Sequence, residues 1–387
     1  MNKQHVWTVV GLVVAATGIG GSLARAAGPA SAPATRPEFE PPTIQSCWDD
    51  LLAGVQSKED WPRRREEIRR QFLELLRDQY KPTKPPLDLT VHETVDVEGI
   101  YIRKLISYNV EADERAHAYL AIPHGLQAPA PAIVHLHGTY AQGKRQSAGL
   151  EDNPEKAFLD QFARRGYIVI APDHFVAGHR IPPEGPYETA RFYRKHPNWT
   201  AVGKFTYEHS IAIDVLQSLS EVDPERIGAL GHSLGGQGTF YLAAYDSRVK
   251  AAVCNCAAPT FRHDPRILDW SRNRWYIYFK HLRPDLLAGR LPPIDTHHVI
   301  ALIAPRPFLE ISALNDGNWK TQQQRVLMNM KLLELYQLLG VPQNYAFYVH
   351  GKGHAVPHDS RQLIAAWMDI HLKPTEATRV KLLELGP

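Results

Sequence analysis

The chain has 387 residues, with 44 Lys plus Arg, 41 Asp plus Glu and 3 Cys, and 44% of its residues are hydrophobic. This length and apolar content allow one large α/β domain or two smaller ones with a buried core, and they exclude a wholly disordered chain. A formal net charge of +3 is too small to indicate a nucleic-acid or anionic-membrane partner. Three cysteines cannot build a disulfide framework, so we expect Cys47, Cys254 and Cys256 to be free thiols.

The first 26 residues have the features of an export signal. Lys3 precedes the apolar run Val6–Ala24, which ends in the small-x-small pattern Ala24-Arg25-Ala26. We therefore expect a cleaved signal peptide over residues 1–26 and an exported protein, periplasmic or extracellular, with no stable membrane partner. An uncleaved membrane anchor is the alternative, because the 19 residues of the run could almost span a bilayer.

The rest of the chain divides into four parts. Residues 27–42 form a Pro/Ala-rich linker, residues 43–88 a helical region, residues 89–375 one α/β domain and residues 376–387 a C-terminal tail. In the helical region apolar residues recur at spacings of three and four, so the basic residues between them are expected on a solvated helix face. These basic residues are Arg63, Arg64, Arg65, Arg69 and Arg70.

From residue 89 onward, β-branched and apolar runs alternate with helical spacing. Strands are expected over residues 89–99, 100–110, 116–123, 131–138, 167–173, 226–233, 250–257, 306–313 and 344–349. Helices are expected over residues 156–166, 207–219 and 237–245. This alternation predicts an α/β fold with a mostly parallel, doubly wound sheet flanked by helices.

The most informative motif is Gly231-His232-Ser233-Leu234-Gly235, placed after an expected strand and before an expected helix. A serine on a tight strand-to-helix turn needs small neighbours, because its backbone is strained and close to adjacent elements. The two glycines supply that room. We interpret Ser233 as a nucleophile. An ordinary Gly-rich turn is the alternative, but such a turn does not require a strand before it and a helix after it.

A serine hydroxyl needs a general base, which in this type of sheet follows the serine and an acid along the chain. His354 is the expected base, because two glycines precede it in a loop after the last strand. His350 and His358 are competitors, the first expected to end the strand and the second to begin the last helix.

Asp316 is the expected acid, because it follows the strand over residues 306–313 directly. The alternative explanation of Asn315-Asp316-Gly317 is a simple turn. Glu310 lies within the strand and is expected to point elsewhere, while Asp264 and Asp269 remain alternative acids.

The turn His137-Gly138-Thr139 after the first buried strand is expected to supply one oxyanion donor, the amide of Thr139. The amide of Leu234, the residue after the serine, is the second donor. His135 and His137 alternate on one strand, but no carboxylate or cysteine accompanies them at ligand spacing. His297 and His298 are adjacent in the sequence, and adjacent residues on a helix or strand rarely converge on one ion. We therefore expect no metal site and no organic cofactor.

The motifs HLHGTY, GHSLGG, LNDGNW and GKGHAVP together resemble the α/β-hydrolase superfamily. The chain is similar to bacterial esterases grouped with dienelactone hydrolases and acetyl xylan esterases. The resemblance implies Ser233, His354 and Asp316 as a catalytic triad. It departs from dienelactone hydrolases, which carry cysteine where Ser233 stands, and from glucuronoyl esterases, which place an arginine where Leu234 stands.

Residues 262–300 are expected to form a small cap over the site, rich in aromatic and arginine side chains. The substrate-binding candidates are Trp275, Arg274, Tyr140 and Trp319, through ring stacking on a sugar or aryl group and charge pairing with a carboxylate. Packing of the cap onto the core explains the same aromatic residues equally well.

The sequence thus predicts an exported serine carboxylic-ester hydrolase that works through an acyl-enzyme. Its substrate is a small-molecule ester or an acylated or esterified carbohydrate. A peptidase or amidase with the same triad is one alternative. A non-catalytic glycan-binding protein on a hydrolase scaffold is the other.

Overall fold

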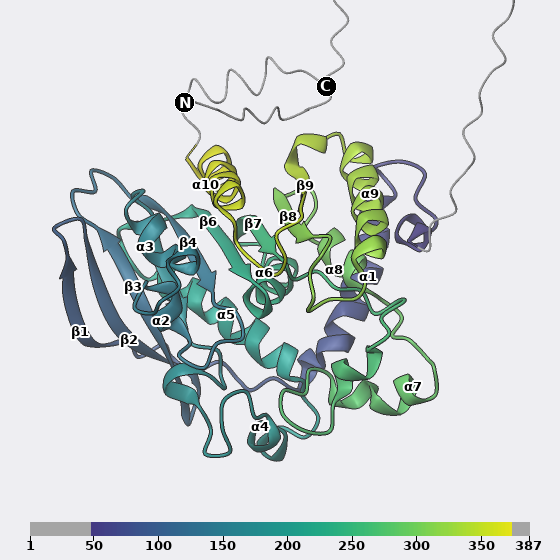
Figure 1. Cartoon of the computed structure of the whole chain (residues 1–387), viewed down its shortest axis with the longest axis horizontal. Helices are drawn as coiled ribbons and strands as arrows, with labels where there is room; N and C mark the ends of the chain where they lie inside the picture. The colour runs from purple at the N-terminus through teal and green to yellow at the C-terminus, as the bar shows by residue number, and fades with distance from the viewer. Residues whose placement is uncertain (1–47, 374–387) are drawn as a thin grey trace, which may run out of the picture. The chain divides into compact units, whose positions relative to one another are not determined.

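The computed structural model describes residues 48–373, which belong to one compact unit. Within this range one sheet has the strand order β1-β2-β3-β5-β4-β6-β7-β8-β9 (Figure 1). The strands are β1 (Thr90–Val97), β2 (Tyr101–Glu111), β3 (Glu114–Pro123), β4 (Ala130–Leu136), β5 (Ile168–Pro172), β6 (Val222–His232), β7 (Val249–Asn255), β8 (Phe308–Ala313) and β9 (Tyr345–His350). The helices are α1 (Trp61–Leu76), α2 (Lys144–Ser147), α3 (Phe158–Ala163), α4 (Ala190–Lys195), α5 (Ala201–Gln217), α6 (Leu234–Tyr245), α7 (Arg283–Leu287), α8 (Thr296–Ala301), α9 (Gln322–Leu338) and α10 (His358–Leu372).

The sheet has a parallel part and an antiparallel edge. Strands β5, β4, β6, β7, β8 and β9 run parallel to one another. Strands β1, β2 and β3 pair antiparallel, and β3 joins β5 antiparallel. Each strand expected from the sequence is present. The predicted mostly parallel sheet flanked by helices is therefore confirmed.

Side chains of the central strands are buried on both faces of the sheet. Along β5, Ile168 and Ile170 pack into one hydrophobic core, while Val169 and Ala171 pack into the other. This follows from the period of two in a strand. Helices α1, α5, α6, α8 and α9 supply the first core, and α3 and α10 supply the second.

The N-terminal helical segment packs into the same core as the sheet. Ile68 and Phe72 of α1 are fully buried, and the Phe72 ring stacks on Tyr241 of α6 at 6.1 Å between centroids. The expectation of a solvated arginine face is wrong for Arg64, which is buried and donates to the backbone oxygens of Asp50 and Leu51. A buried guanidinium is tolerated here because these carbonyls accept its hydrogen bonds.

One helix begins earlier than its apolar spacing predicts. We expected a helix from residue 207, but α5 begins at Ala201. The side chain of Thr200 accepts a hydrogen bond from the N–H of Gly203 at 2.8 Å and so caps the helix. This cap adds almost two turns to the helix.

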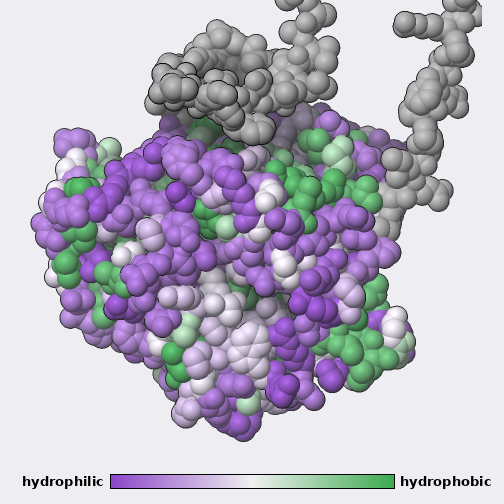
Figure 2. All heavy atoms as spheres, viewed as in Figure 1, coloured by the Kyte–Doolittle hydropathy of each residue, from purple (hydrophilic) through white to green (hydrophobic). Residues whose placement is uncertain are grey.

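The segment over residues 262–300 consists of short helices and irregular backbone. Figure 2 shows a mainly hydrophilic face with a hydrophobic patch over α7, where Leu287 and Leu291 are exposed. No helix among residues 48–373 is long and apolar enough to cross a membrane. The predicted signal peptide, the linker, Cys47 and the tail from residue 376 lie outside the described residues.

The packing of α1 predicts that this helix unfolds together with the sheet. Phe72→Ala should lower the free energy of unfolding by about 3–5 kcal/mol, because it leaves a cavity in the main core. Urea unfolding followed by circular dichroism measures this change. Arg70→Ala, on the exposed face of the same helix, should change it by less than about 0.5 kcal/mol. A separate first transition that alone responds to Phe72→Ala would contradict a shared core.

Candidate active site

Ser233 lies on the sharp turn between β6 and α6. Its backbone has φ 58° and ψ −124°, in the left-handed region that a side chain rarely adopts. A Cβ on Gly231 would lie 2.3 Å from the Gly235 carbonyl oxygen, and one on Gly235 would lie 1.8 Å from that of Leu136. Both glycines of the motif are therefore required by close backbone contacts.

His354 and Asp316 are joined by a hydrogen bond of 2.8 Å between Nδ1 of the imidazole and Oδ2 of the carboxylate. Asp316 is buried and also accepts from the N–H of Asn318 at 2.9 Å. The neighbouring Asn315 donates to Gly351 O and accepts from Gly353 N–H, which ties the aspartate loop to the histidine loop. Hydrogen bonds thus fix both the loop that carries Asp316 and the loop that carries His354.

The competing residues are placed elsewhere. His350 is the last residue of β9 and His358 the first of α10. Glu310 is buried and bonded to Arg325 and Asn329. Of the two alternative acids, Asp264 accepts from the indole of Trp270 and Asp269 pairs with Arg272. Among the described residues, none of these acids has a hydrogen bond to His354.

Ser233 and His354 line the same cavity, together with His232. Among the described residues no direct hydrogen bond joins the serine hydroxyl to the imidazole. Such bonds often tighten only when substrate is bound. The rings of His232 and His354 lie 4.7 Å apart, and burial lowers the pKa of His232 well below its usual value. His232 is consequently neutral beside His354.

The loop after β4 lies directly against the serine turn. A Cβ on Gly138 would be 3.3 Å from the His232 carbonyl oxygen and 3.6 Å from the Ser233 Cβ. Within the described part of the chain, the N–H groups of Thr139 and Leu234 have no hydrogen-bond acceptor. Both N–H groups therefore lack a hydrogen-bond partner among residues 48–373, and Thr139 lines the same cavity as Ser233.

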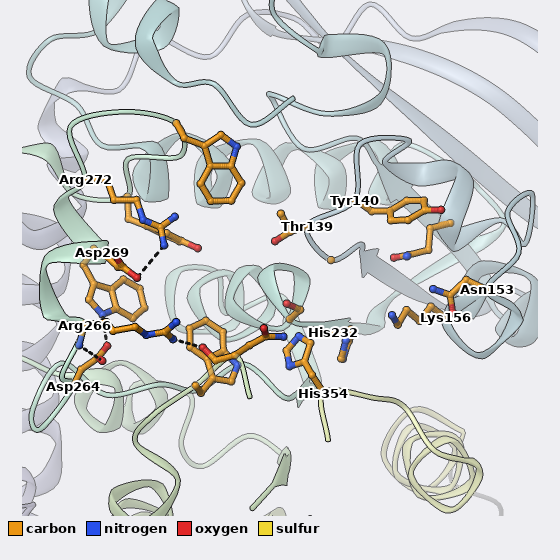
Figure 3. A pocket seen from close by; sticks show the side chains of 18 residues that line it. Thr139, Tyr140, Asn153, Lys156, His232, Asp264, Arg266, Asp269, Arg272 and His354 are labelled. Carbon is orange, nitrogen blue, oxygen red and sulfur yellow. Dashed lines mark hydrogen bonds and ion pairs between the residues drawn. The ribbon is translucent and has the colours of Figure 1, made fainter. Parts of the chain in front are cut away.

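The cavity measures about 420 Å³. In Figure 3, Asp264, Arg266, Asp269 and Arg272 of the cap stand on one side, Tyr140, Asn153 and Lys156 on the other, and His232 and His354 between them. The remaining lining residues are Gly138, Thr139, Gln146, Ser233, Trp270, Trp275, Tyr278, Asn318 and Trp319. Polar and charged groups thus face each other across the cavity.

Three of the four predicted substrate-binding residues line this cavity, namely Tyr140, Trp275 and Trp319. The fourth, Arg274, is exposed and lies outside the lining, while Arg272 takes the place expected for it. The cap backbone is irregular there and Trp275 has φ 57°, so no strand or helix period decides which arginine faces inward.

Sequence reasoning missed several lining residues. Gln146, Asn153, Lys156 and Arg266 come from loops and short helices after β4 and within the cap. Their local sequence carries no motif. Only the three-dimensional path of the loops shows that they line the same cavity as Ser233.

Two groups among residues 48–373 have metal-ligand atoms within 4.8 Å of one another, and neither includes His135 or His137. The first group corrects the expectation for His297 and His298, because both approach Asp50. Arg262 already pairs with Asp50 there and Arg64 faces His298 at 3.4 Å, so the group is neutralised by arginine. The second group is Cys256 with the Asp316–His354 pair. Burial raises the pKa of the Cys256 thiol to about 12, which disfavours the thiolate that a metal would need.

Parts of the sequence are similar to those of known proteins. The dienelactone hydrolase family model matches residues 116–261, a range that includes the serine turn. YtaP of Bacillus subtilis, which is named as a hydrolase, is 27% identical over 314 residues, covering 79% of this chain and 100% of that protein.

Two solved structures are similar in fold. A glucuronoyl esterase from Solibacter usitatus has a TM-score of 0.63 at 18% identity, covering 81% of this chain and 94% of its own. An acetyl xylan esterase from Paenibacillus sp. R4 has a TM-score of 0.55 at 18% identity, covering 84% and 99%. The chain thus has the α/β-hydrolase fold, and its residues 116–261 match the dienelactone hydrolase family model. The predicted α/β-hydrolase fold and the resemblance to dienelactone hydrolases are confirmed.

Buried histidines behind the serine turn make stability depend on pH. Burial lowers the pKa of His135 and of His209 to about 3. Between the usual value near 6.5 and about 3, the unfolded chain therefore binds protons that the folded chain does not. The free energy of unfolding should fall as the pH falls through this window.

Urea unfolding at several pH values between 6.5 and 4 tests this expectation. His135→Leu should reduce the slope by one proton, about 1.4 kcal/mol per pH unit, because it removes one group that titrates only in the unfolded chain. An unchanged slope would show that His135 titrates alike in both states.

Proposed function

We propose that this protein is a serine carboxylic-ester hydrolase that works through an acyl-enzyme. The observation that carries the proposal is the 2.8 Å bond between His354 and Asp316, placed in one cavity with Ser233 on its strained turn. A nucleophile, a base and an acid that orients the base are the parts that acyl transfer requires.

In the first half-reaction, Ser233 Oγ attacks the ester carbonyl carbon and His354 Nε2 accepts the hydroxyl proton. Asp316 holds Nδ1 and stabilises the imidazolium that forms. The amides of Thr139 and Leu234 donate to the negative oxygen of the tetrahedral intermediate. The intermediate then collapses, and His354 returns the proton to the departing alcohol.

In the second half-reaction, water attacks the acyl-enzyme while His354 takes its proton. The acid product leaves and Ser233 regains its proton from His354. His232 stays neutral because it is buried, so it places no second positive charge beside the imidazolium. This chemistry requires neither a metal nor an organic cofactor.

We propose a carbohydrate ester as the substrate. Trp270, Trp275 and Trp319 present ring surfaces to the cavity that suit the flat faces of a sugar. Arg266, Arg272 and the opposing Lys156 supply hydrogen-bond donors to hydroxyl or carboxylate groups. The esterases that share this fold, a glucuronoyl esterase and an acetyl xylan esterase, support the same class.

We further propose that the protein is exported, on the basis of the signal-like residues 1–26. N-terminal sequencing of the protein recovered outside the cytoplasm should begin after Ala26. A chain that retains its first residues in a membrane fraction would instead indicate the uncleaved anchor.

Hydrolysis of 4-nitrophenyl acetate tests the triad. Ser233→Ala should abolish turnover, and Asp316→Asn should lower kcat by about 1,000- to 10,000-fold, because the imidazole loses its orientation and tautomer. Ser218→Ala, an exposed serine at the end of α5, is the matched control and should keep full activity. Full activity of Ser233→Ala would overturn the proposal.

Release of acid from three substrate types separates the candidate functions. Acetylated xylan and glucuronate methyl esters represent carbohydrate esters, and a peptide anilide represents an amidase substrate. We expect carbohydrate ester cleavage that Ser233→Ala eliminates. Turnover of the anilide alone would favour the amidase, and glycan binding without any hydrolysis would favour the non-catalytic protein.

A further inference from the structure

The peptide unit between Gly138 and Thr139 contains one of the proposed oxyanion donors. A peptide unit is planar and trans, so its C=O and N–H point in opposite directions. The direction of the Gly138 carbonyl therefore fixes the direction of the Thr139 N–H. Whatever binds the carbonyl oxygen aims the amide.

Two side chains converge on this carbonyl oxygen from outside the cavity lining. His137 Nδ1 lies 2.7 Å from Gly138 O, and the Tyr187 hydroxyl lies 3.1 Å from it. The Tyr187 hydroxyl also accepts from the N–H of Tyr140 at 2.7 Å and lies 3.0 Å from Tyr140 O. One phenol thus contacts the backbone on both sides of Thr139.

The donor role of His137 follows from its second contact. The N–H of His174 donates to His137 Nε2 at 3.0 Å, so this nitrogen is an acceptor. Burial lowers the pKa of His137, so the imidazole is neutral and carries its single proton on Nδ1. That proton faces the Gly138 oxygen.

Tyr187 is itself fixed against the cap. Its side chain is buried, and its ring centroid lies 6.2 Å from that of Trp275 and 6.0 Å from that of Tyr276. Its backbone has φ 63°, a conformation that costs about 1–3 kcal/mol unless neighbouring contacts stabilise it. The strained backbone of Tyr187 is thus located where its hydroxyl contacts the loop after β4.

We propose that Tyr187 is a positioning residue for ester hydrolysis: with His137 it holds the Gly138–Thr139 peptide so that the Thr139 N–H points at the developing oxyanion. The inference rests on the proposed function. Tyr187 does not itself line the cavity, and within residues 48–373 its hydroxyl bonds only to the backbone of Gly138 and Tyr140, so its effect on the reaction passes through that backbone. Its contact with Trp275 also connects the orientation of this amide to the docked cap.

Tyr187→Phe removes the hydroxyl and keeps the ring. Loss of a whole oxyanion donor lowers kcat by about 100- to 1,000-fold, so a donor that is present but less firmly aimed should lower kcat by about tenfold. On 4-nitrophenyl acetate, KM should change by less than about threefold. Inhibition by benzeneboronic acid, whose serine adduct is tetrahedral, should weaken in step with kcat.

Tyr193→Phe is the matched control. Tyr193 is also buried, and its hydroxyl accepts from the N–H of Ala201 and donates to the carbonyl of Ile277. The Tyr193→Phe variant therefore loses side-chain hydrogen bonds to the backbone of the same kind, but outside the loop that carries Thr139. It should lose similar thermal stability while kcat changes by less than about twofold.

Two variants of His137 test the same peptide independently, should Tyr187→Phe fold poorly. Asparagine can present its amide N–H near the position of Nδ1, whereas glutamine reaches the position of Nε2. His137→Asn should therefore retain more of kcat than His137→Gln. Equal losses of kcat in the two variants would contradict a role of His137 Nδ1 in orienting the Gly138 carbonyl.

The inference would be overturned if wild type and Tyr187→Phe had the same kcat and the same affinity for benzeneboronic acid. It would also be overturned if Tyr193→Phe lost kcat equally, because the effect would then be general stability. Failure of the proposed function has a different result, since Ser233→Ala would then keep the activity of wild type.

Discussion

The site depends on one backbone contact, the approach of the first turn of α6 to the end of β4. Gly235 lies so close to the carbonyl of Leu136 that an added Cβ would be 1.8 Å from its oxygen. This contact places Ser233 beside the loop that begins at His137, and Gly138 then packs on the Ser233 Cβ. Nucleophile and proposed oxyanion donors are therefore positioned by the same pair of elements. The His354–Asp316 pair comes from the loops after β9 and β8, which lie on the opposite side of β6 from β4.

Buried polar groups then fix the loop over the serine. Tyr187 and His137 hold its first residues, and a little further along Lys144 donates to Asp173 at 2.6 Å with both side chains buried. Glycines make room for this carboxylate, since a Cβ on Gly143 or Gly178 would collide with it. Such charges are stabilising only when fully paired. Each hydrogen bond or ion pair that fixes this loop therefore depends on one specific neighbouring residue.

Much of the fold was predictable because the decisive patterns are local. Strand periods and the spacing of glycines about Ser233 depend on neighbouring residues, and these expectations agree with the structure. The cap has no period, so the choice of Arg274 over Arg272 was wrong. Tyr187 could not be found from the sequence, since its role depends on a hydroxyl meeting a backbone oxygen 49 residues away.

The most direct test of Ser233 as the nucleophile is to identify the residue that a fluorophosphonate labels covalently. The full chain is labelled, digested and mapped by mass spectrometry, with ester hydrolysis followed in the same sample. We expect a single modified residue, Ser233, and loss of hydrolysis in proportion to labelling. Labelling of another residue, or full hydrolysis after Ser233 is labelled, would contradict it.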